Sequence, residues 1–111
     1  MKRLIVAGLL LGSITAAVSL TASAAIDADA AQSLAKKNDC FKCHAVDKTK
    51  KGPSLKKIAE KYKGKAEENV IKNITTGPKV KLDDGTEEDH KIIDTKNPKD
   101  LKNLAQWILS H

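Results

Sequence analysis

Two cysteines and a histidine stand close together in the 111-residue chain, at a spacing that can hold a metal-containing group. They are Cys40, Cys43 and His44, in the order C-x-x-C-H. Two thiols at this spacing can add to the two vinyl groups of a porphyrin, and the imidazole that follows can bind its iron. The motif therefore predicts one covalently attached haem c.

A C-x-x-C pair also occurs in structural zinc sites and in dithiol redox centres. Structural zinc needs four ligands, but the chain has only two cysteines, and His90 and His111 lie far from the motif without a paired spacing. A thioredoxin-like centre would need strands around the motif, and the sequence shows no strand pattern there. Haem attachment fits the sequence better than either alternative.

The first 24 residues have the organisation of a secretory signal peptide. Lys2 and Arg3 precede a largely apolar run, and Ala22-Ser23-Ala24 offers small residues for cleavage. Glycine and hydroxyl residues interrupt the run, so we expect no stable membrane anchor. We predict a signal peptide at residues 1–24 and a single domain at residues 25–111 that is exported to the periplasm.

The predicted domain has few large apolar side chains, and its aromatic residues are Phe41, Tyr62 and Trp107. A core of this size needs an additional stabilising element. A covalently held haem can supply a large apolar surface against which short helices pack. We therefore expect the apoprotein to be largely unfolded and both cysteines to form thioether bonds.

Helical patterns cover most of residues 25–111, which predicts an all-α fold. Apolar residues recur at helical spacing in four segments, at residues 28–39, 54–64, 66–75 and from 97 onward. Suitable N-terminal caps are Asp27 or Asp29, Ser54 and Asn97. Residues 76–96 are polar and show no period, so they predict a long irregular loop that carries His90.

The order of these features resembles class I cytochromes c, most of all the small bacterial c-551 or c8 type. The matching segments are an N-terminal helix, C-x-x-C-H, Lys51-Gly52-Pro53-Ser54-Leu55, Tyr62-Lys63-Gly64 and Leu104-Ala105-Gln106-Trp107-Ile108-Leu109-Ser110. The resemblance spans essentially all of residues 25–111. It implies about four short helices and loops around one haem, and a single-electron carrier. An enzyme is not expected, because the sequence offers no constellation of acid, base or nucleophile.

The resemblance also implies roles for individual residues. Cys40 and Cys43 carry the thioether bonds, and His44 is the proximal iron ligand. Pro53 corresponds to the proline whose carbonyl orients the proximal imidazole. Trp107 corresponds to the tryptophan that packs beside the haem and can donate its indole proton to a propionate, with simple core packing as the alternative.

The sequence departs from the family at the sixth iron ligand. Relatives place a methionine in the loop before the last helix, but the only methionine here is Met1, in the predicted signal peptide. His90 lies 17 residues before Trp107, about where the family methionine lies. We predict His90 as the ligand, with His111, a lysine, water or an open site as alternatives. A second imidazole favours ferric iron more than a thioether does, so we expect a lowered reduction potential.

Charge is unevenly distributed along the chain. The formal charge of +6 falls to +4 on loss of Lys2 and Arg3, because all 14 acidic residues lie beyond the signal. Residues 36–65 hold 11 lysines and three acidic residues, whereas residues 83–89 hold five acidic residues. The lysines that flank the haem motif could steer an acidic redox partner, with simple solubility as the alternative: Lys42, Lys48, Lys50 and Lys51.

Three further expectations concern partners and alternative functions. Nucleic-acid binding is not expected, because the predicted domain is exported and lacks aromatic residues interleaved with its basic ones. We expect a monomer. The sequence leaves open two other functions, namely binding of a diatomic gas or peroxide at a labile distal site, and service as the small haem subunit of a larger oxidoreductase.

Overall fold

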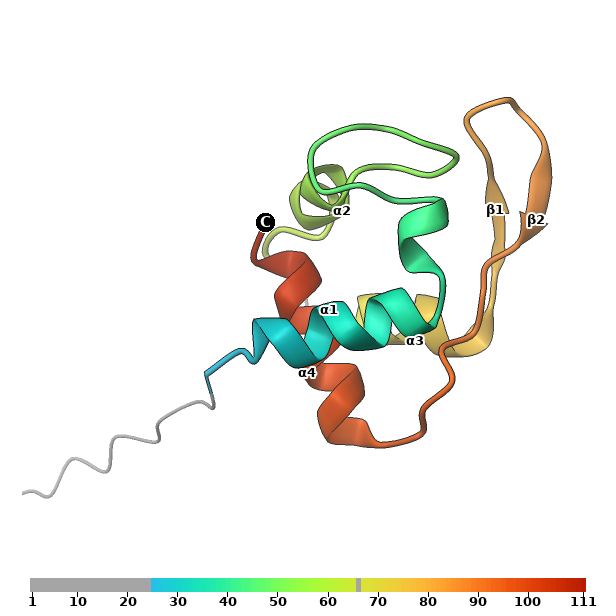
Figure 1. Cartoon of the computed structure of the whole chain (residues 1–111). Coiled ribbons are helices and arrows are strands. Elements are labelled where there is room, and N and C mark those ends of the chain that lie inside the picture. The colour runs from blue at the N-terminus through green and yellow to red at the C-terminus, as the bar shows by residue number, and fades with distance from the viewer. Residues whose placement is uncertain (1–24, 66) are drawn as a thin grey trace, which may run out of the picture.

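The structure, a computed structural model, describes residues 25–65 and 67–111, so the predicted signal peptide lies outside the described residues. Figure 1 shows helices packed around the centre of the domain and a hairpin at its edge. The elements in chain order are α1 (Ala28–Lys37), η1 (Cys40–Lys42), α2 (Leu55–Lys61), α3 (Glu68–Thr76), β1 (Lys79–Lys81), β2 (Glu87–Asp89) and α4 (Pro98–Leu109). The mostly helical fold confirms the predicted architecture. No helix within the described ranges is long and apolar enough to cross a membrane.

Local capping explains why three of the helices begin where the sequence predicts. The Asp27 carboxylate accepts a hydrogen bond from the Ala30 N–H at 3.0 Å, and the Ser54 hydroxyl accepts one from the Lys57 N–H at 3.1 Å. Asn97 caps α4, and Pro98 occupies the first turn, where its missing N–H costs nothing. These contacts confirm Asp27, Ser54 and Asn97 as caps.

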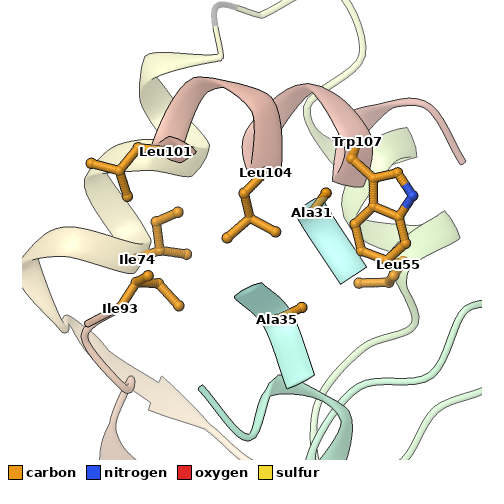
Figure 2. Packing of buried hydrophobic residues seen from close by; sticks show 8 residues of the cluster. All are labelled: Ala31, Ala35, Leu55, Ile74, Ile93, Leu101, Leu104 and Trp107. Atoms are coloured by element: carbon orange, nitrogen blue, oxygen red, sulfur yellow. The ribbon is translucent and has the colours of Figure 1, made fainter. Parts of the chain in front are cut away.

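The core lies where α1 crosses α4, and α2 and α3 also pack against α4 (Figure 1). In Figure 2, Leu104 lies between a group around Ile74 and Ile93 and a group around Leu55 and Trp107. The small side chains of Ala31 and Ala35, only 1% and 2% exposed, let α1 approach α4 closely. The core therefore consists mainly of the apolar stripes of the helices.

The prediction of an irregular loop for residues 76–96 is wrong in part, because this segment contains the antiparallel hairpin of β1 and β2. Gly77, at φ 60°, ends α3, and Gly85, at φ 88°, lies in the turn of the hairpin. The strands pair Lys79 with Asp89 and Lys81 with Glu87. The sequence concealed them because each strand has only three residues and both are largely exposed, which leaves no apolar alternation to detect.

Candidate haem site

A cavity of about 570 Å³ lies between the C-x-x-C-H segment, the hairpin and α4. Its volume is within the range of cofactor pockets, roughly 300–1,000 Å³. Apolar side chains such as Leu55, Ile58, Val70 and Ile74 line much of it. The cavity brings together all six residues singled out from the sequence, which are Cys40, Cys43, His44, Pro53, His90 and Trp107.

The two cysteines face this cavity from a tight turn after α1. The 3-10 helix η1 begins at Cys40, whose carbonyl accepts hydrogen bonds from the N–H groups of Cys43 at 3.2 Å and His44 at 3.0 Å. Burial raises the pKa of the Cys40 thiol. The turn therefore places Cys40, Cys43 and His44 together in the lining of the cavity.

The His44 imidazole is held by the loop that follows it. Its Nδ1 lies 2.6 Å from the Pro53 carbonyl oxygen. Because a carbonyl oxygen can only accept, Nδ1 carries the proton and Nε2 keeps a free lone pair. Burial lowers the pKa of His44, and the nearby His90 ring acts in the same direction, against the opposing effect of the Pro53 carbonyl. The Pro53 carbonyl thus orients the His44 ring so that Nε2 could serve as a metal donor.

His90 enters the same cavity from the end of the hairpin. It follows β2 directly, and its N–H donates to the Pro78 carbonyl at 2.9 Å. Its Nδ1 lies 2.9 Å from the Lys91 carbonyl oxygen, which again assigns the proton to Nδ1 and leaves Nε2 free. The hairpin that sequence patterning missed is therefore the element that positions His90.

The two imidazoles stand at a separation that fits a shared metal. Their ring centres are 6.2 Å apart, and the ring planes are inclined by 38°. An imidazole nitrogen lies about 2 Å from a bound transition metal and about 1.1 Å from its own ring centre, so two imidazoles on opposite sides of one metal place their centres about 6 Å apart. The donor set and its spacing suit a haem iron between His44 and His90.

Trp107 packs at the edge of the cavity, and His111 lies outside it. The Trp107 ring meets Phe41 edge to face with centroids 6.3 Å apart, and it is only 6% exposed. His111 meets the Trp107 ring edge to face with ring centres 4.7 Å apart, and it lines a separate groove beside α2. Within the described residues, His90 is thus the histidine that faces His44.

Two residues near the cavity were not identified from the sequence. Ile93, inside the predicted loop, is 5% exposed, and its N–H donates to the Ile74 carbonyl at 2.8 Å. Asn38, two residues before Cys40, is 1% exposed and accepts a hydrogen bond from the Asp94 N–H at 2.8 Å. Two consecutive isoleucines, Ile92 and Ile93, in an otherwise polar segment were a weak sequence signal of burial. No neighbouring residue indicated that Asn38 is buried or has a distant partner.

Comparisons with known proteins show which family and which relatives the chain is similar to. A sequence model of the family described as cytochrome c matches residues 28–111. Cytochrome c-552 from Nitrosomonas europaea is 35% identical over 114 residues, which cover 90% of this chain and 93% of that protein. Cytochrome c-551 from Azotobacter vinelandii is 35% identical over 83 residues, with 72% of this chain and 95% of that protein covered.

Solved structures show the same fold. The crystal structure of the class 1 cytochrome MtoD from Sideroxydans lithotrophicus ES-1 is 58% identical, with a TM-score of 0.73, and the match covers 78% of this chain and 97% of MtoD. Wild-type Nitrosomonas europaea cytochrome c552 is 34% identical with a TM-score of 0.54, covering 71% of this chain and 96% of that structure. The matches extend over nearly the whole of each relative.

Proposed function

The chain belongs to the cytochrome c family, and we propose that it is a periplasmic electron carrier whose single haem has two histidine ligands. The haem is covalent haem c, attached at Cys40 and Cys43 with His44 in the motif. The family is one of electron-transfer proteins, so the chain is a carrier and not an enzyme. The proposal adds His90 as the second axial ligand, a lowered potential, and export.

One observation carries the assignment of His90. The His44 and His90 rings face the same cavity with centres 6.2 Å apart, and a backbone carbonyl engages Nδ1 of each ring. Both Nε2 atoms are thereby left as metal donors. Five lysines also line the cavity, but the ammonium groups of Lys42, Lys79 and Lys91 are engaged in ion pairs with Asp39 or Asp89.

This arrangement suits outer-sphere electron transfer. Haem iron supplies the one-electron couple between ferric and ferrous states. The protein's part is to keep both axial positions filled, because a fixed ligand set requires little reorganisation at each transfer. The Pro53 carbonyl fixes the His44 ring on one side, and the hairpin with the Lys91 carbonyl fixes His90 on the other.

Low-temperature electron paramagnetic resonance of the ferric protein tests the second ligand. We expect a low-spin signal of the bis-imidazole type in the wild-type protein, and high-spin iron in His90→Ala, because removal of the ring opens the sixth position. His111→Ala is the matched control and should keep the wild-type signal, since His111 lies outside the cavity. A bis-imidazole signal that survives in His90→Ala contradicts the assignment.

Carbon monoxide added to the reduced protein separates a carrier from a gas-binding protein. A firmly held His90 should make binding slow in the wild-type protein and fast in His90→Ala. Rapid binding to the wild-type protein at neutral pH would instead support a sensor or scavenger with a labile distal ligand.

We further propose that Pro53 orients the proximal ligand and that Trp107 packs beside the haem. The short contact between His44 Nδ1 and the Pro53 carbonyl supports the first role, and the buried Trp107 ring at the cavity edge supports the second.

Gly52 offers a test of the proximal side. A Cβ added at Gly52 would lie 2.8 Å from His44 Cε1 and 3.2 Å from Nδ1, so Gly52→Ala must displace the ring or the loop. We expect a weakened iron–His44 bond, seen as a shifted iron–histidine stretch in resonance Raman spectra of a five-coordinate ferrous form made in the His90→Ala background. Gly85→Ala is the control, because its Cβ would meet nothing within 4 Å and the strain from its φ of 88° falls on the turn of the hairpin rather than on the His44 loop. An unchanged stretch in Gly52→Ala contradicts this role for the Pro53 loop.

Docking to an acidic partner is proposed from the lysines around the haem motif. Lys48 and Lys51 are exposed, Lys42 lines the cavity, and Lys50 Nζ donates to the Phe41 carbonyl at 2.6 Å. Within residues 36–65 lysines greatly outnumber acidic residues, so this part of the surface carries a positive potential.

Charge reversal of Lys48 and Lys51 together tests this surface with small oxidants. We expect Lys48→Glu/Lys51→Glu to slow oxidation by ferricyanide several-fold at low salt and to speed oxidation by a cationic cobalt complex. The effect should vanish near 1 M salt, where the screening length falls to about 3 Å. The control is Lys96→Glu/Lys99→Glu, which changes the net charge by the same amount as the first double variant. Its two positions lie just before and within the first turn of α4, away from the loop that carries Lys48 (Figure 1). Equal effects of the two double variants would show that net charge alone acts.

Export is supported by the apolar and small-residue pattern of residues 1–24 and by the need for haem attachment outside the cytoplasm. N-terminal sequencing of the haem-containing protein from a periplasmic fraction should begin at Ala25. A start at Met1 would contradict cleavage.

A further inference from the structure

The residue that precedes the haem motif by two positions connects the two sides of the cavity. Asn38 ends α1, and its side chain is almost completely buried. Its Nδ2 donates to the Leu34 carbonyl at 2.9 Å, which holds the amide against the helix. Its Oδ1 accepts the N–H of Asp94 at 2.8 Å, across 56 residues of sequence. Asn38 therefore joins the helix that leads to Cys40 with the segment that follows His90.

The next residue makes a second contact between the same two segments. Asp39 has φ 59°, a left-handed conformation that aspartate adopts more readily than most residues other than glycine. Its carboxylate lies 3.2 Å from Lys91 Nζ and 3.2 Å from Lys42 Nζ. The three side chains are about half-exposed or more, so solvent screens these pairs. The Asn38 contact is buried and less accessible to water, which makes it the stronger of the two connections.

The segment that carries His90 is held at both ends. On one side the His90 N–H bonds to Pro78, and on the other the N–H groups of Ile93 and Asp94 bond to Ile74 and Asn38. Between these anchors, Ile92 is exposed, at 57%, and gives the segment little packing. Release of the Asp94 anchor would leave Ile93, with its hydrogen bond to the Ile74 carbonyl, as the remaining backbone anchor of this segment beyond His90.

We propose that Asn38 is a positioning residue that holds the His90 segment against the haem-attachment turn and so limits opening of the sixth iron position. The proposal rests on the proposed ligand role of His90. Because the hydrogen bond from Asp94 lies just beyond His90, its loss raises the population of conformers in which the imidazole has moved off the metal. A ligand from solvent can bind only to those conformers, so its apparent rate rises in proportion to their population.

Stopped-flow mixing of the reduced holoprotein with carbon monoxide tests this role. We expect Asn38→Ala to bind carbon monoxide at least tenfold faster than the wild-type protein, equivalent to about 1.4 kcal/mol in the opening equilibrium. The ferric protein should remain low-spin, because His90 is still present. Asn38→Asp keeps an acceptor for the Asp94 N–H but loses the donor to the Leu34 carbonyl and buries a charge, so it should bind carbon monoxide at a rate between those of the wild-type protein and Asn38→Ala. Asp39→Ala should raise the rate less than Asn38→Ala.

Leu101→Ala is the control for stability, because Leu101 is a buried core residue that does not line the cavity. Leu101→Ala should lower the melting temperature without changing the rate of carbon monoxide binding by more than about twofold. The void left by the truncated side chain lies in the helical core and not in the haem cavity. Asn38→Ser, which leaves a smaller cavity, provides a second truncation if the alanine variant does not fold. Unchanged binding in Asn38→Ala or Asn38→Ser, or an equal acceleration in Leu101→Ala, overturns the proposal.

The His90→Ala variant distinguishes this failure from failure of the ligand assignment. If His90→Ala is high-spin and the Asn38 truncations bind carbon monoxide at the wild-type rate, the positioning role alone is wrong. If His90→Ala remains low-spin with bis-imidazole signals, the ligand assignment is wrong and the positioning role falls with it.

Discussion

Replacement of both Cys40 and Cys43 by alanine should give a colourless and largely unfolded protein. The folded domain surrounds a cavity of about 570 Å³ with apolar side chains, and without a covalent haem these would face solvent or an empty space. The helical core is small, with several alanines among its buried residues. Loss of the haem therefore removes a large part of the apolar contact area, and we expect loss of the entire folding free energy, about 5–15 kcal/mol for a small domain.

Far-ultraviolet circular dichroism and haem staining after denaturing electrophoresis measure this outcome together. The double variant should lack both the stain and most of the helical signal of the wild-type protein. His90→Ala is the matched control, because it removes an axial ligand and leaves both attachment thiols in place, so it should stain and remain helical. A colourless double variant with a cooperative thermal transition and wild-type helicity would show that the polypeptide folds without haem.

His90→Met should raise the reduction potential. A thioether stabilises ferrous iron relative to ferric iron more than an imidazole does, and the proposed second ligand is an imidazole. The side chains are similar in length, and the hairpin holds the backbone of residue 90 through the Pro78 carbonyl, so the methionine sulfur can reach the same position. We expect a rise on the order of 0.1 V, a modest part of the roughly 0.8 V that axial ligands span.

Spectroelectrochemical titration of both proteins measures this shift, and the sulfur-to-iron charge-transfer band at the red end of the ferric spectrum reports a bond from iron to sulfur. His111→Met is the control and should leave the potential near the wild-type value, because His111 contacts Trp107 edge to face and does not line the haem cavity. An unchanged potential in His90→Met, or a rise only in His111→Met, would contradict the role of His90 as sixth ligand.

Short-range sequence patterns accounted for the helices and the attachment turn. Asp27, Ser54 and Asn97 cap the helices that follow them within three residues, and the apolar stripes recur every three or four residues. Cys40, Cys43 and His44 lie within five consecutive residues, so they are close in space without any long-range contact. These features depend on neighbouring residues and are therefore visible without a structure.

No short-range sequence pattern indicated the hairpin of β1 and β2 or the hydrogen bond between Asn38 and Asp94. Each strand has three residues with charged side chains along the pair, and Asn38 meets Asp94 only after the chain has folded across 56 residues. An asparagine at a helix end is common for local reasons, so its type did not indicate a distant partner.

The amino-acid sequence by itself determined that one haem is attached at Cys40 and Cys43, that helices surround it, and that the only methionine is Met1. The sequence favoured His90 over His111 only through the resemblance, and only the tertiary structure decided which histidine faces His44, because both lie far from it along the chain. The hairpin directs His90 to a ring separation of 6.2 Å, whereas α4 places His111 behind Trp107. Metal ligation depends on distances of a few ångströms between remote residues, and such distances are set by packing and long-range hydrogen bonds.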